Sequence, residues 1–455
     1  MHDVIIIGGG INGAGLFRDL ALHGLDVLLL EKGDFSSQTS QGSSKMLHGG
    51  IRYLENFDFA LVQEALEEKN LWLKLAPHIC SERKFYLPVY NWSKWPLPFV
   101  RTGIFLYDAL SHFQNRPGGL VWRDQMLKDF PTINPQGLKG AGTYYDGIVD
   151  DHKLALECIW DGELEDKAVA LNYQEVIKIE ERENSTRVHY RDLLTKKESQ
   201  SDAKFIIYAT GPFTDELLPK WGVPWTQALL PSKGIHLWIK DDALKLSGPM
   251  VLQTKDNRVI FVIPQRHAIL VGTTETPVDQ EMFNIKATDG DVNYLLSVLN
   301  DYFPTAQINH SHILNTFAAI RPLVKEDTGQ DRGKTSRFHR IFRPTKNSYV
   351  LLGGKYTTFR RMGQDVLKEL VPRLGVAYRD HLTLNPLRKT STVGTFTDTE
   401  VSAEKIKTTI RTESVRTYED LITRRLSWLN PPESYKEISG LSKVDIEKLI
   451  QDYQR

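Results

Sequence analysis

The first residues of the chain join the apolar run Val4–Ile7, typical of a buried parallel strand, to a glycine-rich turn. Gly8, Gly10 and Gly13 stand there in G-x-G-x-x-G spacing. This spacing lets a dinucleotide pyrophosphate approach the backbone, and the helix that begins there offers free N–H groups to its charge. The second apolar run ends in Glu31, where a carboxylate would bind the ribose hydroxyls of an adenosine. The alternative is a glycine-rich turn in an ordinary α/β protein.

A second segment, Thr39–Glu55, gathers side chains that carry chemistry. It holds small hydroxyl residues, the pair Gly49-Gly50, the imidazole of His48 and the guanidinium of Arg52. A neutral imidazole accepts protons near neutral pH, and a guanidinium binds anions with a planar fork of donors. A solvated loop rarely places histidine, two glycines, arginine and tyrosine so close together, so this segment is a candidate site.

The elements that must position these residues alternate between helix and strand patterns. Helical periodicity runs from Ala14 to His23 and again from about Phe59 to Leu75, whereas residues 79–145 are predicted to be irregular. Strand patterns then dominate, before a last helix, a polar linker and a charged tail. The remaining predicted segments are the strands Ala168–Ile179, Arg187–Arg191, Lys204–Ala209, Ile235–Ile239, Arg258–Ile263, Ala268–Gly272 and Ser348–Leu352, the helices near Val292–Asn300 and Thr358–Val371, the linker 390–400 and the helical tail 401–455.

The composition is that of an ordinary globular chain. Lys plus Arg and Asp plus Glu both total 57, so no bulk charge suggests nucleic acid as a partner. The two cysteines, Cys80 and Cys158, fit a reducing compartment such as the cytoplasm and form no metal-binding pattern. No run of about 18 apolar residues could span a membrane. The glycine-rich unit begins so close to Met1 that we expect no signal peptide before it.

The nucleotide-binding pattern is interrupted along the chain. Its first strand–helix–strand unit lies at the N-terminus, yet strand–glycine–helix elements return near residues 205 and 350, with strand-rich segments between them. We therefore predict an α/β protein in which a Rossmann-like domain is interrupted by an antiparallel-sheet domain and followed by a short helical C-terminal region. Flavoproteins of the D-amino-acid oxidase type are similar in this arrangement.

Further motifs strengthen that likeness. They are Tyr145–Asp151, Thr210-Gly211-Pro212, Lys233–His236, Val271–Thr274, Ile320–Leu323 and Gly353–Arg360. With the two segments above, they resemble the FAD-dependent glycerol-3-phosphate dehydrogenases, in order over roughly residues 1–375. The resemblance implies a tightly but non-covalently bound FAD that takes hydride from C2 of sn-glycerol 3-phosphate. The product is dihydroxyacetone phosphate, and the electrons pass on to a quinone.

The resemblance also implies the domain layout. Residues 1–385 are the FAD-dependent oxidoreductase region, and residues 386–455 are a linker with a helical C-terminal domain shorter than in many members of the family. That difference leaves open the oligomeric state, with a homodimer among the options, and the route to a quinone. The predicted FAD-binding parts are about 1–75, 150–225 and 335–385, and the substrate or cap parts are about 76–149 and 226–334.

A phosphate dianion favours arginine, because a guanidinium forms two parallel hydrogen bonds with it. Arg52, Arg321 and Arg337 are the candidates for this role. Tyr53 adds a hydroxyl donor and Lys355 a further cation, so all five are predicted to bind substrate. Each arginine has the alternative of being a surface charge, above all Arg337, which stands among other arginines.

His48, His236 and Arg321 form the predicted catalytic set. An unperturbed imidazole has a pKa of about 6.5, which suits proton removal from the C2 hydroxyl. We predict His48 as this base, because the family folds its loop against the flavin, and His236 as a partner that positions the substrate. Either histidine could instead be structural.

The motif Gly353–Arg360 follows a strand that ends in two glycines before a helix. In the family, the N–H groups of this turn face the N1–C2=O edge of the flavin, where reduction places negative charge, and Lys355 would help to stabilise it. A simple threonine N-cap is compatible with the same residues. No metal is predicted. The predicted cofactor-binding residues are Gly8, Gly10, Asn12, Gly13, Glu31, Thr39, Ser40, Ser44, Lys45, Leu47, His48, Gly49, Gly211, Gly354, Lys355, Thr357 and Thr358.

The segment Asn91–Arg101, which leads into Ile104–Tyr107, places aromatic residues between cations. This pattern is typical of a segment at a bilayer interface, although a loop buried against the core has the same composition. The resemblance favours a peripheral membrane enzyme on the inner face of the cytoplasmic membrane. The alternatives are an oxidase of the same fold, which passes electrons to O2 or acts on another 2-hydroxy acid or amine, and a flavin-binding protein without catalysis.

Overall fold

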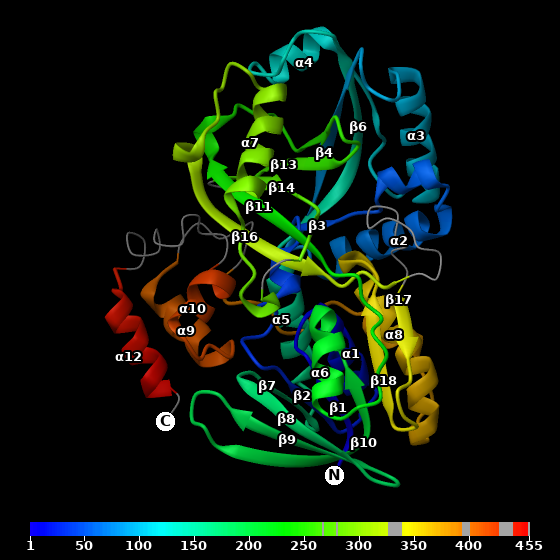
Figure 1. The fold of residues 1–455 in the computed structure, drawn as a ribbon, viewed down its shortest axis with the longest axis vertical. Helices are drawn as coiled ribbons and strands as arrows, with labels where there is room; N and C mark the ends of the chain where they lie inside the picture. Colours follow the sequence, from blue (N-terminus) through cyan, green and yellow to red (C-terminus); the bar gives the residue numbers. More distant parts are fainter. Residues whose placement is uncertain (266–267, 279–280, 326–338, 394–400, 427–439, 454–455) are drawn as a thin grey trace.

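The computed structural model describes residues 1–265, 268–278, 281–325, 339–393, 401–426 and 440–453. Figure 1 shows two sheets stacked along the long axis, with a small helical region beside the lower one. The chain passes repeatedly between the sheets, so the predicted α/β fold with an interrupted nucleotide-binding domain is confirmed.

In the described part of the chain, the lower sheet has eight strands in the order β17-β18-β10-β1-β2-β7, with β8 and β9 attached to β10 through β9. The central strands β18, β10, β1, β2 and β7 run parallel. The bounds are β1 (His2–Ile7), β2 (Val27–Leu30), β7 (Ala168–Leu171), β8 (Gln174–Glu181), β9 (Thr186–Asp192), β10 (Glu198–Tyr208), β17 (His339–Phe342) and β18 (Ser348–Gly353).

Both faces of this sheet are covered, which explains why its parallel strands are continuous apolar runs rather than alternating ones. Val4 and Ile6 belong to the core cluster formed with the helices α1, α5 and α8. Ile5 and Ile7 point to the opposite face, where they join Leu218 and the hairpin β8–β9. The helices are α1 (Ile11–Leu22), α2 (Phe59–Leu75), α5 (Asp151–Gly162), α6 (Thr214–Lys220) and α8 (Phe359–Leu370).

The upper sheet has ten strands among the described residues and runs in the order β15-β11-β14-β13-β12-β4-β6-β3, with β16 on β11 and β5 on β6. All its pairs are antiparallel except β12 with β4. The bounds are β3 (Met46–Leu47), β4 (Cys80–Tyr90), β5 (Gly119–Trp122), β6 (Leu138–Val149), β11 (Ser232–Lys240), β12 (Met250–Gln253), β13 (Val259–Pro264), β14 (Ala268–Gly272), β15 (Thr276–Pro277) and β16 (Ile313–Arg321), with the helices α3 (Leu97–Leu110), α4 (Arg123–Asp129) and α7 (Asp289–Tyr302).

The prediction that residues 79–145 are irregular is wrong. The segment contains β4, α3, β5, α4 and most of β6. Pro96 and Pro98 flank the first residue of α3, where the helix needs no N–H donor, so they mark a helix start rather than a loop. The long pairing of β4 with β6, from Cys80 opposite Val149 onward, is non-local and leaves no local signal.

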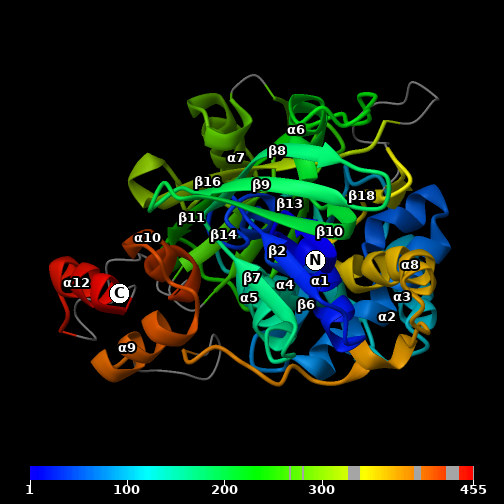
Figure 2. The same cartoon turned by 90° about the horizontal axis from the view of Figure 1, so that it is seen from below.

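The C-terminal region is helical where it is described, as predicted, and it has a small core of its own. Figures 1 and 2 place it on the side of the molecule opposite α2, α3 and α8. Its elements are α9 (Ala403–Thr412), α10 (Tyr418–Asp420), the π-helical turn η11 (Leu421–Arg425) and α12 (Lys443–Tyr453). Most of the predicted linker lies outside the described residues, and the domain boundaries stay a prediction. In the described residues, no helix is both long and apolar enough to cross a bilayer.

Candidate active site

A cavity of about 780 Å³ is lined by residues from both sheets. The predicted residues that line it are Gly8, Gly10, Asn12, Glu31, Thr39, Ser40, Ser44, His48, Tyr53, Gly211, His236, Arg321, Gly354 and Lys355. Seven other predicted residues do not line it. These are Gly13, Lys45, Leu47, Gly49, Arg52, Thr357 and Thr358. Arg337 lies outside the described residues.

The glycine-rich turn has no room for side chains. Gly8 has a φ of +111°, and a Cβ added there would lie 2.4 Å from the carbonyl oxygen of Ala209. A Cβ on Gly13 would lie 1.9 Å from the carbonyl oxygen of Gly8, so α1 packs directly on the turn. Gly13 therefore acts through packing, whereas Gly8 and Gly10 form the cavity wall that a pyrophosphate could approach.

The carboxylate of Glu31 is fixed at the end of β2. Its two oxygens accept hydrogen bonds of 2.7 Å from the backbone N–H groups of Gly9 and Gly33. Burial raises the pKa of Glu31, and these two N–H groups oppose the rise. At the start of α1, the Ser40 hydroxyl accepts a hydrogen bond of 2.9 Å from Ile11 N. The hydroxyl thus lies at the positive end of the helix, where a phosphate would bind.

The upper sheet contributes His236 to the cavity wall, almost fully buried in β11. Its Nε2 lies 2.9 Å from the Ser44 hydroxyl, and its ring stacks on Phe317 with centroids 4.9 Å apart. Burial and the positive charges of Arg321 and Lys45 lower the pKa of His236 to about 3, so the ring stays neutral. Among the described residues, its Nδ1 has no hydrogen-bond partner.

Arg321, at the end of β16, is held by the residues that follow β14. Its Nη1 and Nη2 donate to Thr274 O at 3.2 Å, and Nη2 donates to the Thr273 hydroxyl at 2.9 Å. Gly234 makes room for it, because a Cβ there would lie 2.6 Å from Nη2. The two threonines stand in a motif already quoted, but only the strand register of the sheet reveals their contact with Arg321.

Two motifs far apart in sequence meet around Lys355. Its ammonium lies 4.1 Å from the centre of the Tyr53 ring and donates to Gly49 O at 3.4 Å. The backbone N–H of His48 donates to the Thr357 hydroxyl at 3.1 Å. The turn after β18 thus supports the loop that presents His48 and Tyr53 to the cavity.

Several predicted residues have other contacts. Leu47 is buried in β3, and Gly49 N donates to the Tyr107 hydroxyl at 2.9 Å. Thr358 donates to Lys355 O at 3.3 Å inside the turn. Arg52 is exposed in the 3₁₀ helix Ile51–Asn56 and does not line the cavity. The assignment of roles to these residues stays a prediction.

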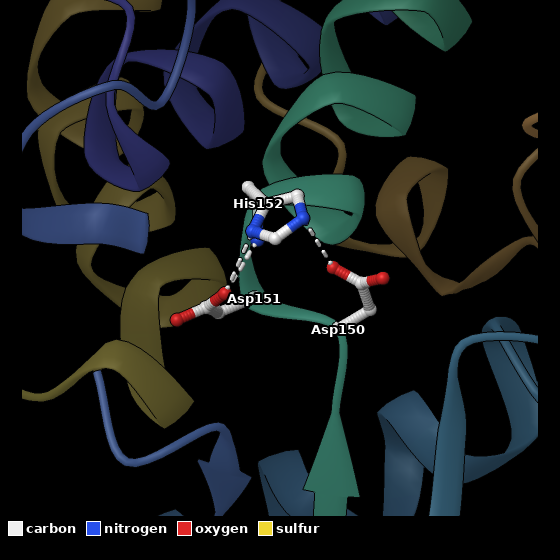
Figure 3. A group of neighbouring side chains, drawn as sticks. All are labelled: Asp150, Asp151 and His152. Carbon is white, nitrogen blue, oxygen red and sulfur yellow. Dashed lines mark hydrogen bonds and ion pairs between the residues drawn. The ribbon is translucent and has the colours of Figure 1, made fainter. Parts of the chain in front are cut away.

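Lys45 is ion-paired with Asp151 at 2.7 Å, beside a buried cluster at the start of α5. Figure 3 shows His152 between the carboxylates of Asp150 and Asp151, with contacts of 2.9 and 3.0 Å. Such a group could ligate a metal ion. Here, however, Lys45 and His152 already hold the pKa of Asp151 below its ordinary value in spite of burial. We therefore interpret the cluster as structural.

Sequence reasoning missed an aromatic pair that also lines the cavity. The rings of Phe213 and Phe283 stack with centroids 3.9 Å apart, and the Lys32 ammonium lies 4.4 Å from the centre of the Phe283 ring. A flat, apolar surface with a cation beside it suits a purine ring. The two phenylalanines lie 70 positions apart, so no local motif indicates the pair.

Comparison with known proteins identifies the family. The model of the FAD dependent oxidoreductases matches residues 3–357. A glycerol-3-phosphate dehydrogenase of Synechocystis is 34% identical over 391 residues, which cover 82% of this chain and 70% of that protein. The chain belongs to the FAD-dependent glycerol-3-phosphate dehydrogenases. This flavoenzyme is also 34% identical to an alpha-glycerophosphate oxidase of Streptococcus pneumoniae, over 72% of its own chain and 55% of the oxidase.

The fold of this flavoenzyme is also that of a solved structure. It matches the glycerol-3-phosphate dehydrogenase from Bacillus halodurans complexed with FAD, with a TM-score of 0.76 and 22% identity, over 100% of this chain and 94% of that one. The chain spans 70% of the length of the Synechocystis relative and 52% of that of a mitochondrial glycerol-3-phosphate dehydrogenase from Bos taurus. The residues present fit FAD, because the glycine wall, the Glu31 carboxylate, the Ser40 hydroxyl and the Lys355 ammonium line one cavity.

Proposed function

We propose that this chain oxidises sn-glycerol 3-phosphate to dihydroxyacetone phosphate. Bound FAD supplies the acceptor for the hydride that leaves C2. The observation that carries the proposal is a cationic group, Arg321, fixed beside the neutral ring of His236 in the cavity that begins at the glycine-rich turn. The relatives named glycerol-3-phosphate dehydrogenase support this choice of substrate.

Arg321 is our candidate for binding the phosphate. Its bonds to Thr273 and Thr274 hold the planar guanidinium in one orientation in the cavity lining, so the group is preorganised for an anion. Lys355 and Tyr53 line the same cavity and would add a cation and a hydroxyl donor. Arg52 would reach the substrate only by turning in from the surface, and Arg337 is proposed from the sequence alone.

The proton of the C2 hydroxyl must leave as the hydride leaves, because otherwise a protonated ketone forms. A pKa of about 3 makes His236 a weak base but keeps it available as a neutral hydrogen-bonding partner for the substrate hydroxyl. We therefore assign the proton to His48, which lines the cavity in the loop supported by Thr357. His236 is assigned the positioning role.

We propose a quinone as the electron acceptor and contact with a membrane surface as the means of reaching it. On and beside α3, Trp95, Phe99 and Phe105 are 38–62% exposed, and the Lys94 ammonium lies 5.0 Å from the centre of the Trp95 ring. Figure 1 shows α3 at the outer edge of the upper sheet. Aromatic residues with an adjacent cation favour the headgroup region of a bilayer. The association of two copies stays a prediction.

The decisive experiment is anaerobic titration of the purified protein, followed by the flavin absorbance. We expect glycerol 3-phosphate to bleach the absorbance, and glycerol, lactate and glycine to leave it unchanged. Bleaching by glycine or lactate instead would move the protein to an amine or 2-hydroxy-acid oxidase. Rapid reoxidation by air with formation of H2O2 would favour the oxidase alternative, and no bleaching by any of the four would support a non-catalytic flavoprotein.

A further inference from the structure

Two adjacent arginines of the C-terminal region form ion pairs with one carboxylate of the FAD-binding region. Arg425 binds Asp34 through both terminal nitrogens, with Nη2 at 3.0 Å from Oδ1 and Nη1 on Oδ2. Arg424 donates from Nε to the same Oδ2. Asp34 lies three residues after Glu31, in the loop that leads from β2 to the 3₁₀ helix Thr39–Gly42. The C-terminal tail therefore binds the loop close to Glu31, the predicted ribose-binding carboxylate.

This contact is buried, unlike an ordinary surface ion pair. The exposed fractions of the side chains are 1% for Asp34, 7% for Arg424 and 0% for Arg425. In spite of the burial, Arg425 and Arg424 hold the pKa of Asp34 at about 2, so the carboxylate stays charged. A buried ion pair contributes little net stability, but it strongly penalises any arrangement in which one partner is left alone. The ion pairs of Asp34 with Arg424 and Arg425 therefore fix the position of the loop relative to the tail.

The tail also forms a hydrogen bond with the other end of the loop. Arg424 Nη1 donates to the Gln41 side-chain oxygen at 3.3 Å, and the Gln41 amide donates to Ser37 O. Asn172 Nδ2 lies 3.0 Å from both Asp34 Oδ1 and Ser414 O, so it joins the loop to the tail a second time. Both ends of the segment 34–41 are thus tied to the C-terminal region.

Most residues between these two anchors line the cavity in which we propose that FAD binds. Ser36, Ser37, Gln38, Thr39 and Ser40 all line the cavity, whereas the anchors Asp34 and Gln41 do not. The loop is also joined to the glycine-rich turn, because Ser36 N donates to Gly9 O at 2.9 Å. The tail therefore binds the loop through residues that do not line the cavity, and the residues between them form part of the cavity wall.

We propose that Arg424 and Arg425 are positioning residues that hold the loop Asp34–Gly42 in the conformation that binds the ADP half of FAD. The C-terminal helical region is then part of the cofactor site rather than an appendage. The inference rests on the proposed binding of FAD in this cavity. It predicts that weakening the contacts of Arg424 and Arg425 with the loop lowers the affinity for FAD. The affinity of the FAD-bound enzyme for its substrate should not change.

A second contact, made by Arg388 at the start of the predicted C-terminal region 386–455, provides the control. Arg388 pairs with Asp161 at 2.9 Å and with Glu165 at 2.8 Å, on α5 and the turn after it, and does not touch the loop. The Arg388 side chain is 44% exposed, so the two contacts differ in burial and the melting temperature must be measured for both variants. A purely structural role predicts that FAD affinity falls only in step with the melting temperature. A positioning role predicts that only the contact with Asp34 governs FAD affinity.

The experiment compares Arg424→Lys with Arg388→Lys in the full chain. We would measure the dissociation constants for FAD and for ADP alone with the apoprotein, its melting temperature, and the KM for glycerol 3-phosphate at saturating FAD. Lysine keeps the charge but cannot bind Asp34, Gln41 and Asp420 together. We expect Arg424→Lys to weaken FAD and ADP binding about tenfold to a hundredfold, with the KM unchanged and Arg388→Lys like the native chain.

Equal affinities in the native chain and Arg424→Lys would overturn the inference, and so would equal losses in the two variants. If Arg424→Lys does not fold, Gln41→Leu removes the acceptor at the far end of the loop without unpairing a buried charge. It is expected to weaken ADP binding several-fold, and native affinity would overturn the inference. A native chain that binds no FAD would overturn the proposed function as well. If the native chain binds FAD and glycerol 3-phosphate bleaches it, but the variants match it, only this inference fails.

Discussion

Two groups of cavity residues are built in different ways: those proposed for the adenosine, here called the adenosine end, and those proposed for the substrate, here called the substrate end. At the adenosine end, Gly8, Gly10 and Glu31 stand in one continuous stretch of the chain. The turn has no room for a Cβ at Gly8, and backbone N–H groups of Gly9 and Gly33 fix the Glu31 carboxylate. At the substrate end, His236 and Arg321 come from separate strands and are fixed by side-chain contacts. A site built from one continuous stretch can be predicted from the spacing of residues in the sequence, whereas a site built from separate strands depends on the register of the sheet.

The largest effect should come from the substrate end, with His48→Ala. We expect the variant to keep its FAD and to bind glycerol 3-phosphate, but to reduce the flavin ~10²–10⁴ times more slowly, because no base takes the hydroxyl proton. Anaerobic stopped-flow reduction measures this directly. His236→Ala is the comparison and should chiefly weaken substrate binding. If His48→Ala reduces at the native rate while His236→Ala does not, the base has been assigned to the wrong histidine.

Arg321→Lys tests whether the substrate end depends on geometry rather than on charge. Lysine keeps the positive charge but cannot bond Thr273, Thr274 and a phosphate with one planar group, so the KM for glycerol 3-phosphate should rise about 100-fold. The flavin content should not change. Steady-state kinetics measure the KM. The control is Arg258→Lys, because Arg258 forms a surface ion pair with Asp256. Native kinetics in Arg321→Lys would remove that residue from the site.

The adenosine end should respond in cofactor affinity and not in substrate kinetics. Glu31→Gln removes a charged hydrogen-bonding group and should weaken FAD binding by about 1–3 kcal/mol, measured by equilibrium titration of the apoprotein. The control is Glu180→Gln in β8, a 33% exposed carboxylate that does not line the cavity. Denaturing the native protein should release a yellow chromophore of the size of FAD. Flavin that stays with the precipitate would contradict non-covalent binding.

The same contrast explains what the sequence could predict. The helix predicted over Phe59–Leu75 and the strand over Ala268–Gly272 have the observed bounds, because local periodicity decides them. The pairing of β4 with β6 was missed, since no local pattern indicates a partner strand so far along the chain. For the site, the turn and Glu31 follow from spacing, but the grip of Arg424 on Asp34 spans 390 positions. Contacts of that kind become visible only in the folded chain.

The carboxylate of Asp146 contacts the loop that contains His48 and Gly49. It provides a test through the pH dependence of stability. Its carboxylate accepts hydrogen bonds from the Tyr107 hydroxyl at 2.8 and 2.9 Å, and Gly49 N lies 3.4 Å from Oδ1. Burial raises the pKa of Asp146 to about 6, even though Lys69 opposes the rise. The folded state therefore binds this proton more tightly than the unfolded state. The resulting stabilisation is complete below pH 3.8 and is lost as the pH rises through about 6.

Asp146→Asn stays neutral and keeps an acceptor for Tyr107, so it should lack this dependence. Between pH 4 and pH 8, the free energy of unfolding of the native chain should fall relative to the variant by on the order of 2 kcal/mol. Urea unfolding at several pH values measures the difference. Parallel curves for the two proteins would show that Asp146 does not titrate in this range.

The smallest effect concerns the exposed surface of α3, which neither end of the cavity uses. Phe99 and Phe105 are 62% and 56% exposed, and burying such rings in a bilayer interface is favourable. Replacing both with serine should reduce co-sedimentation with vesicles of anionic lipid several-fold. Flavin bleaching by glycerol 3-phosphate should be unaffected, because neither residue lines the cavity. Leu164→Ser, at a 48% exposed site just after α5, is the control and should sediment like the native protein. If the native chain does not sediment with vesicles at all, α3 is not a membrane contact, and a route to the quinone must be sought elsewhere on the molecule.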